Sequence, residues 1–236
     1  MRLLTTTVAL TALTIGAGTP LFAQERGIQN SNAYITGLGG FATSVGTTNN
    51  NTTSDVMVEG GVRIAPHLMV FASGGRFGNL QGDLQPTLDS ATTALAANQG
   101  LTVVGGGRLP AWYGAGGLRF EVPTQSRILP YVLGGLGVAR LNPTPQLFFS
   151  SGTMPDGSTP AVGDDVTSAI VAAGDFTAPP SSNALLLMLG GGIEIPVVPH
   201  WVIDAGYRYS RIAADSTLSA SPLNANSGTF GVGYRF

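Results

Sequence analysis

Hydrophobic and polar residues alternate over eight segments of the chain, most of them bounded by turn-forming residues. Alternation with a period of two puts neighbouring side chains on opposite faces, so the pattern predicts β-strands rather than helices. The expected strands are Asn32–Val45, Ser54–Ala65, Leu68–Asn79, Arg108–Val122, Ile128–Leu141, Asn183–Ile195, Trp201–Ala213 and Ala225–Phe236. The fold class expected from them is all-β.

In four of these strands one face is apolar and the other carries charged residues or glycine. The apolar positions are Val56, Val58, Val62, Ile64, Trp112, Leu118, Phe120, Val122, Trp201, Ile203, Tyr207, Tyr209, Phe230, Val232, Tyr234 and Phe236. An apolar outer face and a polar inner face are typical of a barrel that spans a lipid bilayer. A soluble β-sandwich also alternates, but it would not place Arg and Glu on its inner face. The first, fifth and sixth strands are too rich in glycine for their faces to be assigned.

The connections between the strands alternate in length. The short ones are Ala65–His67, Pro123–Arg127 and Pro196–His200, and the long ones are Thr47–Thr53, Leu80–Gly107, Asn142–Ser182 and Ala214–Asn224. Bacterial barrels have an even number of strands, short periplasmic turns and long outer loops. The pattern therefore predicts an eight-stranded antiparallel transmembrane β-barrel with both chain termini on the periplasmic side.

Two of the long connections contain further structural signals. Thr87–Asn98 has the composition of a short helix over the barrel mouth. The connection Asn142–Ser182 is long for a segment without secondary structure. Its apolar residues favour either an extension of the flanking strands above the membrane or a fold over the lumen.

The composition supports export and excludes several functions. Charged residues make up 10% of the 236 residues, whereas about 25% is usual for soluble domains. The chain has no cysteine and no lysine, which removes thiol chemistry, Schiff bases and the Walker A loop. A net charge of −2 argues against nucleic acid as a partner. Met1–Ala23 resembles a secretory signal peptide, with a membrane-anchor helix as the alternative, and the barrel domain is expected over residues 24–236.

Three segments resemble the small outer-membrane barrels of the outer-membrane-protein-A and opacity-protein type. They are Pro130–Gly137, Asp204–Tyr209 and the final Gly231–Phe236. The resemblance implies a location in the bacterial outer membrane, contact with outer-membrane lipid, and biogenesis by the barrel assembly machinery. It also implies that this machinery reads an assembly signal formed by Phe230, Val232, Tyr234 and Phe236.

Charged residues at inward positions form the main candidate site. Counted from the turns, they are Glu59, Arg63, Arg76, Arg119, Glu121, Glu194, Asp204, Arg208 and Arg235. Eight strands enclose an interior only just wide enough for side chains, and arginine pairs well with carboxylates. We therefore expect a cross-lumen charge network that blocks continuous water. The alternative is that these charges face a wet lumen.

The function expected from these features is non-enzymatic, with a structural or adhesin-like role at the cell surface. A narrow channel for small solutes is the alternative, and a lipid-modifying barrel enzyme is a third. His67 and His200 both fall in short periplasmic turns, far from the outer leaflet. We expect no catalytic residues, no cofactor and no metal site, because the acidic Asp164, Asp165 and Asp175 lack the spacing of a calcium loop. An extracellular ligand would contact loops 80–107 and 142–182.

Overall fold

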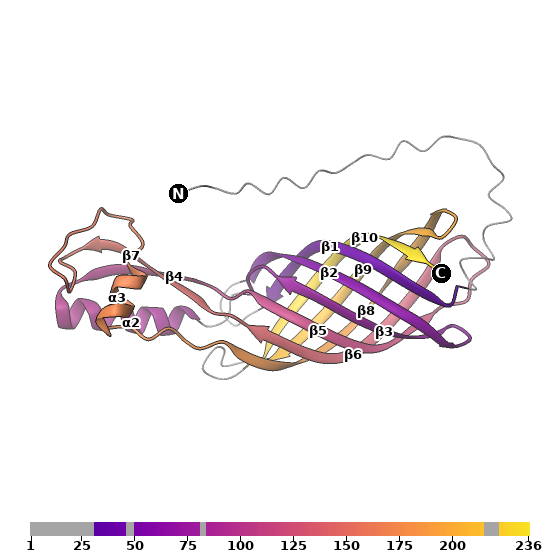
Figure 1. Cartoon of the computed structure of the whole chain (residues 1–236), viewed down its shortest axis with the longest axis horizontal. Coiled ribbons are helices and arrows are strands. Elements are labelled where there is room, and N and C mark those ends of the chain that lie inside the picture. Colours follow the sequence, from indigo (N-terminus) through magenta and orange to yellow (C-terminus); the bar gives the residue numbers. More distant parts are fainter. Residues whose placement is uncertain (1–30, 46–49, 81–83, 215–221) are drawn as a thin grey trace.

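A computed structural model describes residues 31–45, 50–80, 84–214 and 222–236. The proposed signal peptide therefore lies outside the described residues. Eight strands form a closed antiparallel barrel in the order β1-β10-β9-β8-β6-β5-β3-β2 (Figure 1). Their bounds are Ala33–Val45 (β1), Asn50–Ala65 (β2), Leu68–Phe77 (β3), Ala111–Glu121 (β5), Leu129–Leu141 (β6), Ser182–Val198 (β8), Trp201–Ala213 (β9) and Leu223–Arg235 (β10). The predicted eight-stranded barrel is confirmed.

The two longest connections fold into a separate structure that we call the distal unit. It comprises α2 (Leu84–Gln99), β4 (Thr102–Arg108), β7 (Thr144–Ser151) and α3 (Thr167–Ala173). The unit projects from the end of the barrel opposite the C-terminus (Figure 1). The helix predicted over Thr87–Asn98 is present and longer than expected, and Gly100 ends it with a positive φ of 63°.

The distal unit is an extension of the barrel wall. Trp112 pairs with Arg140 in the β5–β6 ladder, and Arg108 pairs with Thr144 in the β4–β7 ladder. The register is the same in both, because the two residue numbers of each pair add to 252. Asn142 N donates to Pro110 O across the junction. Of the two alternatives for residues 142–182, the structure shows the extension of the flanking strands.

The face of the extended hairpin that continues the inner surface of the barrel is covered by α2. A Cβ atom on Gly105 would lie only 3.0 Å from the Leu88 Cβ, so the helix packs directly on the glycines of β4. The buried core of the unit consists of Leu84, Leu88, Leu95, Leu101, Val103, Leu147, Phe149, Met154, Val166, Ile170 and Phe176. These side chains and the apolar side chains inside the barrel belong to one continuous cluster. The opposite face of β4 leaves Val104 60% exposed.

Side-chain burial follows the predicted alternation in the barrel strands. Val56, Leu118 and Phe230 are exposed on the outer surface, whereas Glu59 and Arg119 are buried inside. Phe77 and Tyr131 also point inward, although aromatic residues near strand ends are common at lipid interfaces. None of the helices in the described ranges is long and apolar enough to cross a membrane.

Candidate functional site

The lumen contains a continuous chain of ion pairs. Arg63 Nη2 lies 2.9 Å from Glu121 Oε2, and Glu121 Oε1 lies 2.5 Å from Arg235 Nη2. Arg235 Nε in turn donates to Glu194 Oε2 at 2.6 Å. Glu194 Oε1 accepts from Arg119 Nη2, so its two oxygens hold two different arginines.

The chain continues through a second glutamate. Arg119 Nη1 lies 3.3 Å from Glu59 Oε1, and Arg208 Nη1 donates to Glu59 Oε2 at 2.6 Å. Arg119, Arg208 and Arg235 are at most 1% exposed, as are Glu59 and Glu194. Burial of so many charges is tolerated only when each has a close partner of opposite sign. We call these four arginines and three glutamates the lumen network.

The network joins strands that are not neighbours in the sheet. β5 carries Arg119 and Glu121 and pairs only with β3 and β6, yet its ion pairs reach β2, β8 and β10. Arg208 on β9 likewise reaches Glu59 on β2. The side chains therefore meet across the interior and tie opposite walls of the barrel together.

Tyrosines surround the network and orient it. Tyr34 donates to Glu59 Oε1 at 2.7 Å, and the Arg119 guanidinium lies 3.6 Å from the ring centroid of Tyr131. Tyr131 also donates to Asp204 Oδ1 at 2.8 Å. Asp204 is fully buried and is the cross-strand neighbour of Glu194, but among the described residues no salt bridge includes it. These tyrosine contacts had no counterpart in the sequence analysis.

Arg76 does not belong to the lumen network, contrary to the sequence prediction. Phe77 and Gly75, which flank it in β3, are at inward-facing positions, so Arg76 faces outward and is exposed on the outer surface. There the guanidinium lies 5.4 Å from the ring centroid of Trp112, which is also exposed. The inward assignment is wrong because an outward arginine costs little at the membrane interface, where Arg76 lies near the end of its strand.

The half of the lumen nearer the distal unit is mostly apolar, although Asp55 is buried there and accepts a hydrogen bond from Tyr113. The inward side chains there include Phe71, Phe77, Leu141, Leu186, Met188 and Ile212, all at most 1% exposed. The run of leucines on both faces of β8 is the sequence signal that could have indicated this. The lumen thus has an ion-paired layer near the chain terminus and a mainly apolar layer toward the distal unit, in which Asp55 is bound by Tyr113.

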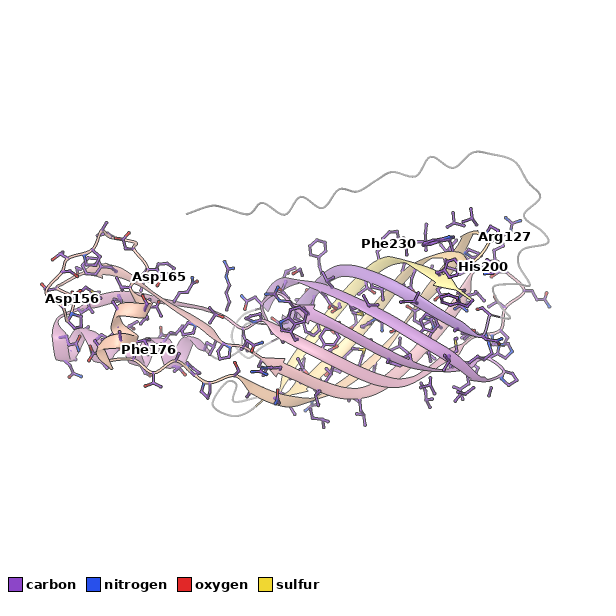
Figure 2. The ribbon with its side chains drawn as sticks, in the orientation of Figure 1. Arg127, Asp156, Asp165, Phe176, His200 and Phe230 are labelled. Atoms are coloured by element: carbon purple, nitrogen blue, oxygen red, sulfur yellow. The ribbon has the colours of Figure 1, made fainter. Side chains whose placement is uncertain are left out.

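Acidic residues dominate the surface of the distal unit. The described members are Asp89, Asp156, Asp164, Asp165 and Asp175, all exposed, and Figure 2 shows Asp156 and Asp165 at the far end of the molecule from His200. Asp156 accepts hydrogen bonds from the backbone N–H and the hydroxyl of Ser158, which hold the pKa of its carboxyl below its usual value. Within the described ranges no group of three or more metal-ligating side chains gathers.

The predicted assembly residues form part of an aromatic cluster beside the C-terminus. The ring of Tyr234 lies 4.9 Å from that of Phe236, 5.3 Å from that of Trp201 and 5.5 Å from that of His200, measured between centroids. Phe230, Val232 and Phe236 are exposed on the outer surface of β10 and just beyond it. His200 Nδ1 lies 2.8 Å from Arg235 O, so this histidine is bound into the turn. The recognition of these residues by the assembly machinery stays a prediction.

Deletion of Phe236 is expected to lower insertion into the outer membrane of living cells. Unassisted refolding into short-chain lipid vesicles should fall much less, because the loss is confined to the ring contact with Tyr234 and two backbone hydrogen bonds, with Asn32 and Ala33, at the end of the ladder. Heat-modifiable gel mobility of membrane fractions and of refolded protein measures both. An equal loss in the two assays would mean that Phe236 contributes to stability alone.

Comparisons with known proteins agree with this architecture. Residues 6–236 match the family described as outer membrane protein beta-barrel domain. The chain is similar in structure to Neisserial surface protein A, with a TM-score of 0.55, 16% identity, and coverage of 86% of this chain and 97% of that one. It also resembles the attachment invasion locus protein of Yersinia pestis (TM-score 0.47, 14% identity, 87% and 99% covered) and OprG of Pseudomonas aeruginosa (0.42, 16%, 89% and 99%). No curated protein sequence matches the chain.

Proposed function

Since this chain belongs to the outer membrane protein β-barrel family, we propose that it is a non-enzymatic surface protein whose distal unit contacts partners outside the cell. The observation that carries the proposal is the distal unit itself. Two connections far apart in the sequence pair through β4 and β7 and share a hydrophobic core with α2 and α3. A loop that only closed the barrel would need neither the helices nor the core.

The lumen network supports a closed barrel rather than a channel. Its ion pairs cross the interior between β2, β5, β8, β9 and β10, and an eight-stranded barrel leaves little space beside its side chains.

The charge of the distal unit favours a cationic or neutral partner. The described part of the unit carries five exposed aspartates and one arginine, Arg108. Such a surface repels polyanions within roughly 10 Å at ordinary ionic strength. The acidic side chains also bond the backbone locally, as Asp165 does to Thr167 N at 3.0 Å, so the charges are held in place.

Attachment of bacteria to charged surfaces tests the proposal. Cells displaying the full chain should adhere to polylysine-coated surfaces several-fold more than cells without it, and not to heparin-coated surfaces. The matched variant lacks the distal unit, with residues 81–108 and 142–181 each replaced by a short Gly/Ser turn. The geometry allows this, because Leu80 N already donates to Leu109 O at 2.8 Å and Leu141 pairs with Ser182.

The shortened barrel should lose the attachment and keep heat-modifiable mobility on gels. Single-channel recording should give small or intermittent conductance for both proteins, since the lumen network is intact in both. Unchanged attachment without the distal unit, or a large steady conductance of the full chain, would overturn the proposal.

A further inference from the structure

The charged side chains on the outer face of the barrel strands are all arginines, and all of them lie near the same end of the barrel. Every carboxylate in the described barrel strands points inward, namely Asp55, Glu59, Glu121, Glu194 and Asp204. The exposed arginines Arg76, Arg140 and Arg211 instead lie in the last three residues of β3, β6 and β9. Each of these strands runs toward the distal unit, so the arginines mark the rim of the barrel on that side.

Two of these arginines lie side by side around a tryptophan. Arg76 on β3 pairs in register with Trp112 on β5, and Trp112 pairs with Arg140 on β6. Cross-strand neighbours on one face are about 5 Å apart, so the three side chains form a continuous row on the outer wall. Arg108 lies four residues above Trp112 on the same face and is also exposed. We call Arg76, Arg108 and Arg140 with Trp112 the rim cluster.

Among the described residues, no carboxylate lies at salt-bridge distance from the arginines of the rim cluster. No salt bridge between described residues includes Arg76, Arg108 or Arg140, whereas each lumen arginine has at least one. β3 and β6 have 10 and 13 residues, and a transmembrane strand needs about 9–11. Arg76, Arg140 and Trp112 therefore lie at the level of the lipid head groups, where the cost of an outward arginine nearly vanishes, and Arg108 lies above them.

From this arrangement we propose that the rim cluster is a binding site for the phosphate groups of a phosphorylated glycolipid in the outer leaflet. The planar guanidinium donates two parallel hydrogen bonds to a phosphate, which lysine cannot do. The chain uses arginine throughout and no lysine. The Trp112 ring between the arginines would contact the sugar or acyl part of the lipid, since indole rings prefer the membrane interface.

The site is separate from the partner surface proposed for the distal unit. The aspartates of that unit lie beyond the rim, and its helices cover the face of the hairpin that continues the lumen, not the face that bears Trp112. Phosphorylated lipid at the rim would fix the barrel in the leaflet without touching those aspartates. Loss of lipid binding and loss of surface attachment are therefore distinguishable.

Tryptophan fluorescence of the full chain in vesicles provides the test. The sequence has two tryptophans, so Trp201→Phe leaves Trp112 as the only reporter. This protein is refolded into phosphatidylcholine vesicles that contain increasing mole fractions of diphosphorylated lipid A. We expect a saturable change, and Arg140→Gln and Arg76→Gln should each raise the half-saturating fraction by about ten-fold, because bonds to charged groups are lost. Lipid A retained per protein after mild detergent extraction gives a second readout by mass spectrometry.

The matched control is Arg211→Gln. Arg211 is exposed near the same end of β9 but pairs with Leu187 and Asn224, so it has the same charge and no arginine neighbour. It should leave the half-saturating fraction within about two-fold, as expected for loss of a diffuse surface charge. Equal effects of Arg211→Gln and Arg140→Gln would overturn the site. An equal response to dephosphorylated lipid A, or to inorganic phosphate in solution, would overturn the assignment to lipid phosphate.

Discussion

Replacing Glu194 with glutamine should strongly destabilise the barrel. Glu194 is fully buried and holds both Arg119 and Arg235, so its loss leaves two buried arginines each with one fewer carboxylate. Removing one partner of a buried ion pair costs about 3–5 kcal/mol. We expect a decrease of this size in the free energy of unfolding, measured by urea titration of the protein in lipid vesicles.

Asp204→Asn is the matched control for this exchange. Asp204 is equally buried, lies opposite Glu194 on β9, and is bonded to Tyr131 rather than to an arginine at salt-bridge distance. Its amide analogue keeps an oxygen that accepts from Tyr131, so unfolding should shift by less than about 1.5 kcal/mol, the usual value of one hydrogen bond. Equal losses in the two variants would mean that interior charge in general, and not the ion-pair chain, stabilises the barrel.

The same network predicts the electrical behaviour of the barrel. Glu194→Ala also removes side-chain volume between β8 and β5, so water can pass where the Arg119 and Arg235 contacts closed the interior. Conductance in planar bilayers should rise above that of the unmodified protein. A large wild-type conductance that this exchange leaves unchanged would instead support the narrow channel.

The barrel was predictable because its signals are local. Alternation along one strand, as at Val56, Val58 and Glu59, directly reports which side faces lipid. The alternation of short and long connections then fixes the order of the strands. Most of the lumen network followed from the same alternation, since Arg119, Glu121 and Arg235 are inward by counting alone.

Two features were not predictable in this way, for different reasons. In β3 both faces are apolar, with Val70 outside and Phe71 inside, so no contrast between the faces could check the count from the turns that placed Arg76 inward. The distal unit depends on pairing between Val103 and Phe149, which are far apart in the sequence and leave no local trace. One signal could have indicated it. The alternation of inward and outward positions in β5 and β6 continues into β4 and β7, where it places Val103 and Phe149 on the inward side.

Leu88→Ala should unfold the distal unit while leaving the barrel intact. Leu88 is 1% exposed and packs over Gly105 at the centre of the α2–β4 contact. A Leu→Ala exchange in a core costs about 2–5 kcal/mol, which is a large fraction of what so small a core can supply. In vesicles with the distal unit outside, proteinase K should therefore cleave within residues 84–108 or 142–176 much faster than in the unmodified protein.

The matched control for Leu88→Ala is an exchange at Val104. This residue precedes Gly105 in β4 and lies on the face of the strand that α2 does not cover. Val104 is 60% exposed, so Val104→Ala removes almost no buried surface and should leave the cleavage rate nearly unchanged. Heat-modifiable gel mobility should persist in both variants, because the barrel is closed by its own ladders and by the lumen network. The apolar cluster nevertheless runs without a break from Phe77 in the barrel to Leu88 in the unit. If Leu88→Ala abolishes the heat-modifiable band, the barrel and the distal unit unfold as one cooperative body. A substitution that destabilises the attachment surface would then also destabilise the membrane-embedded barrel.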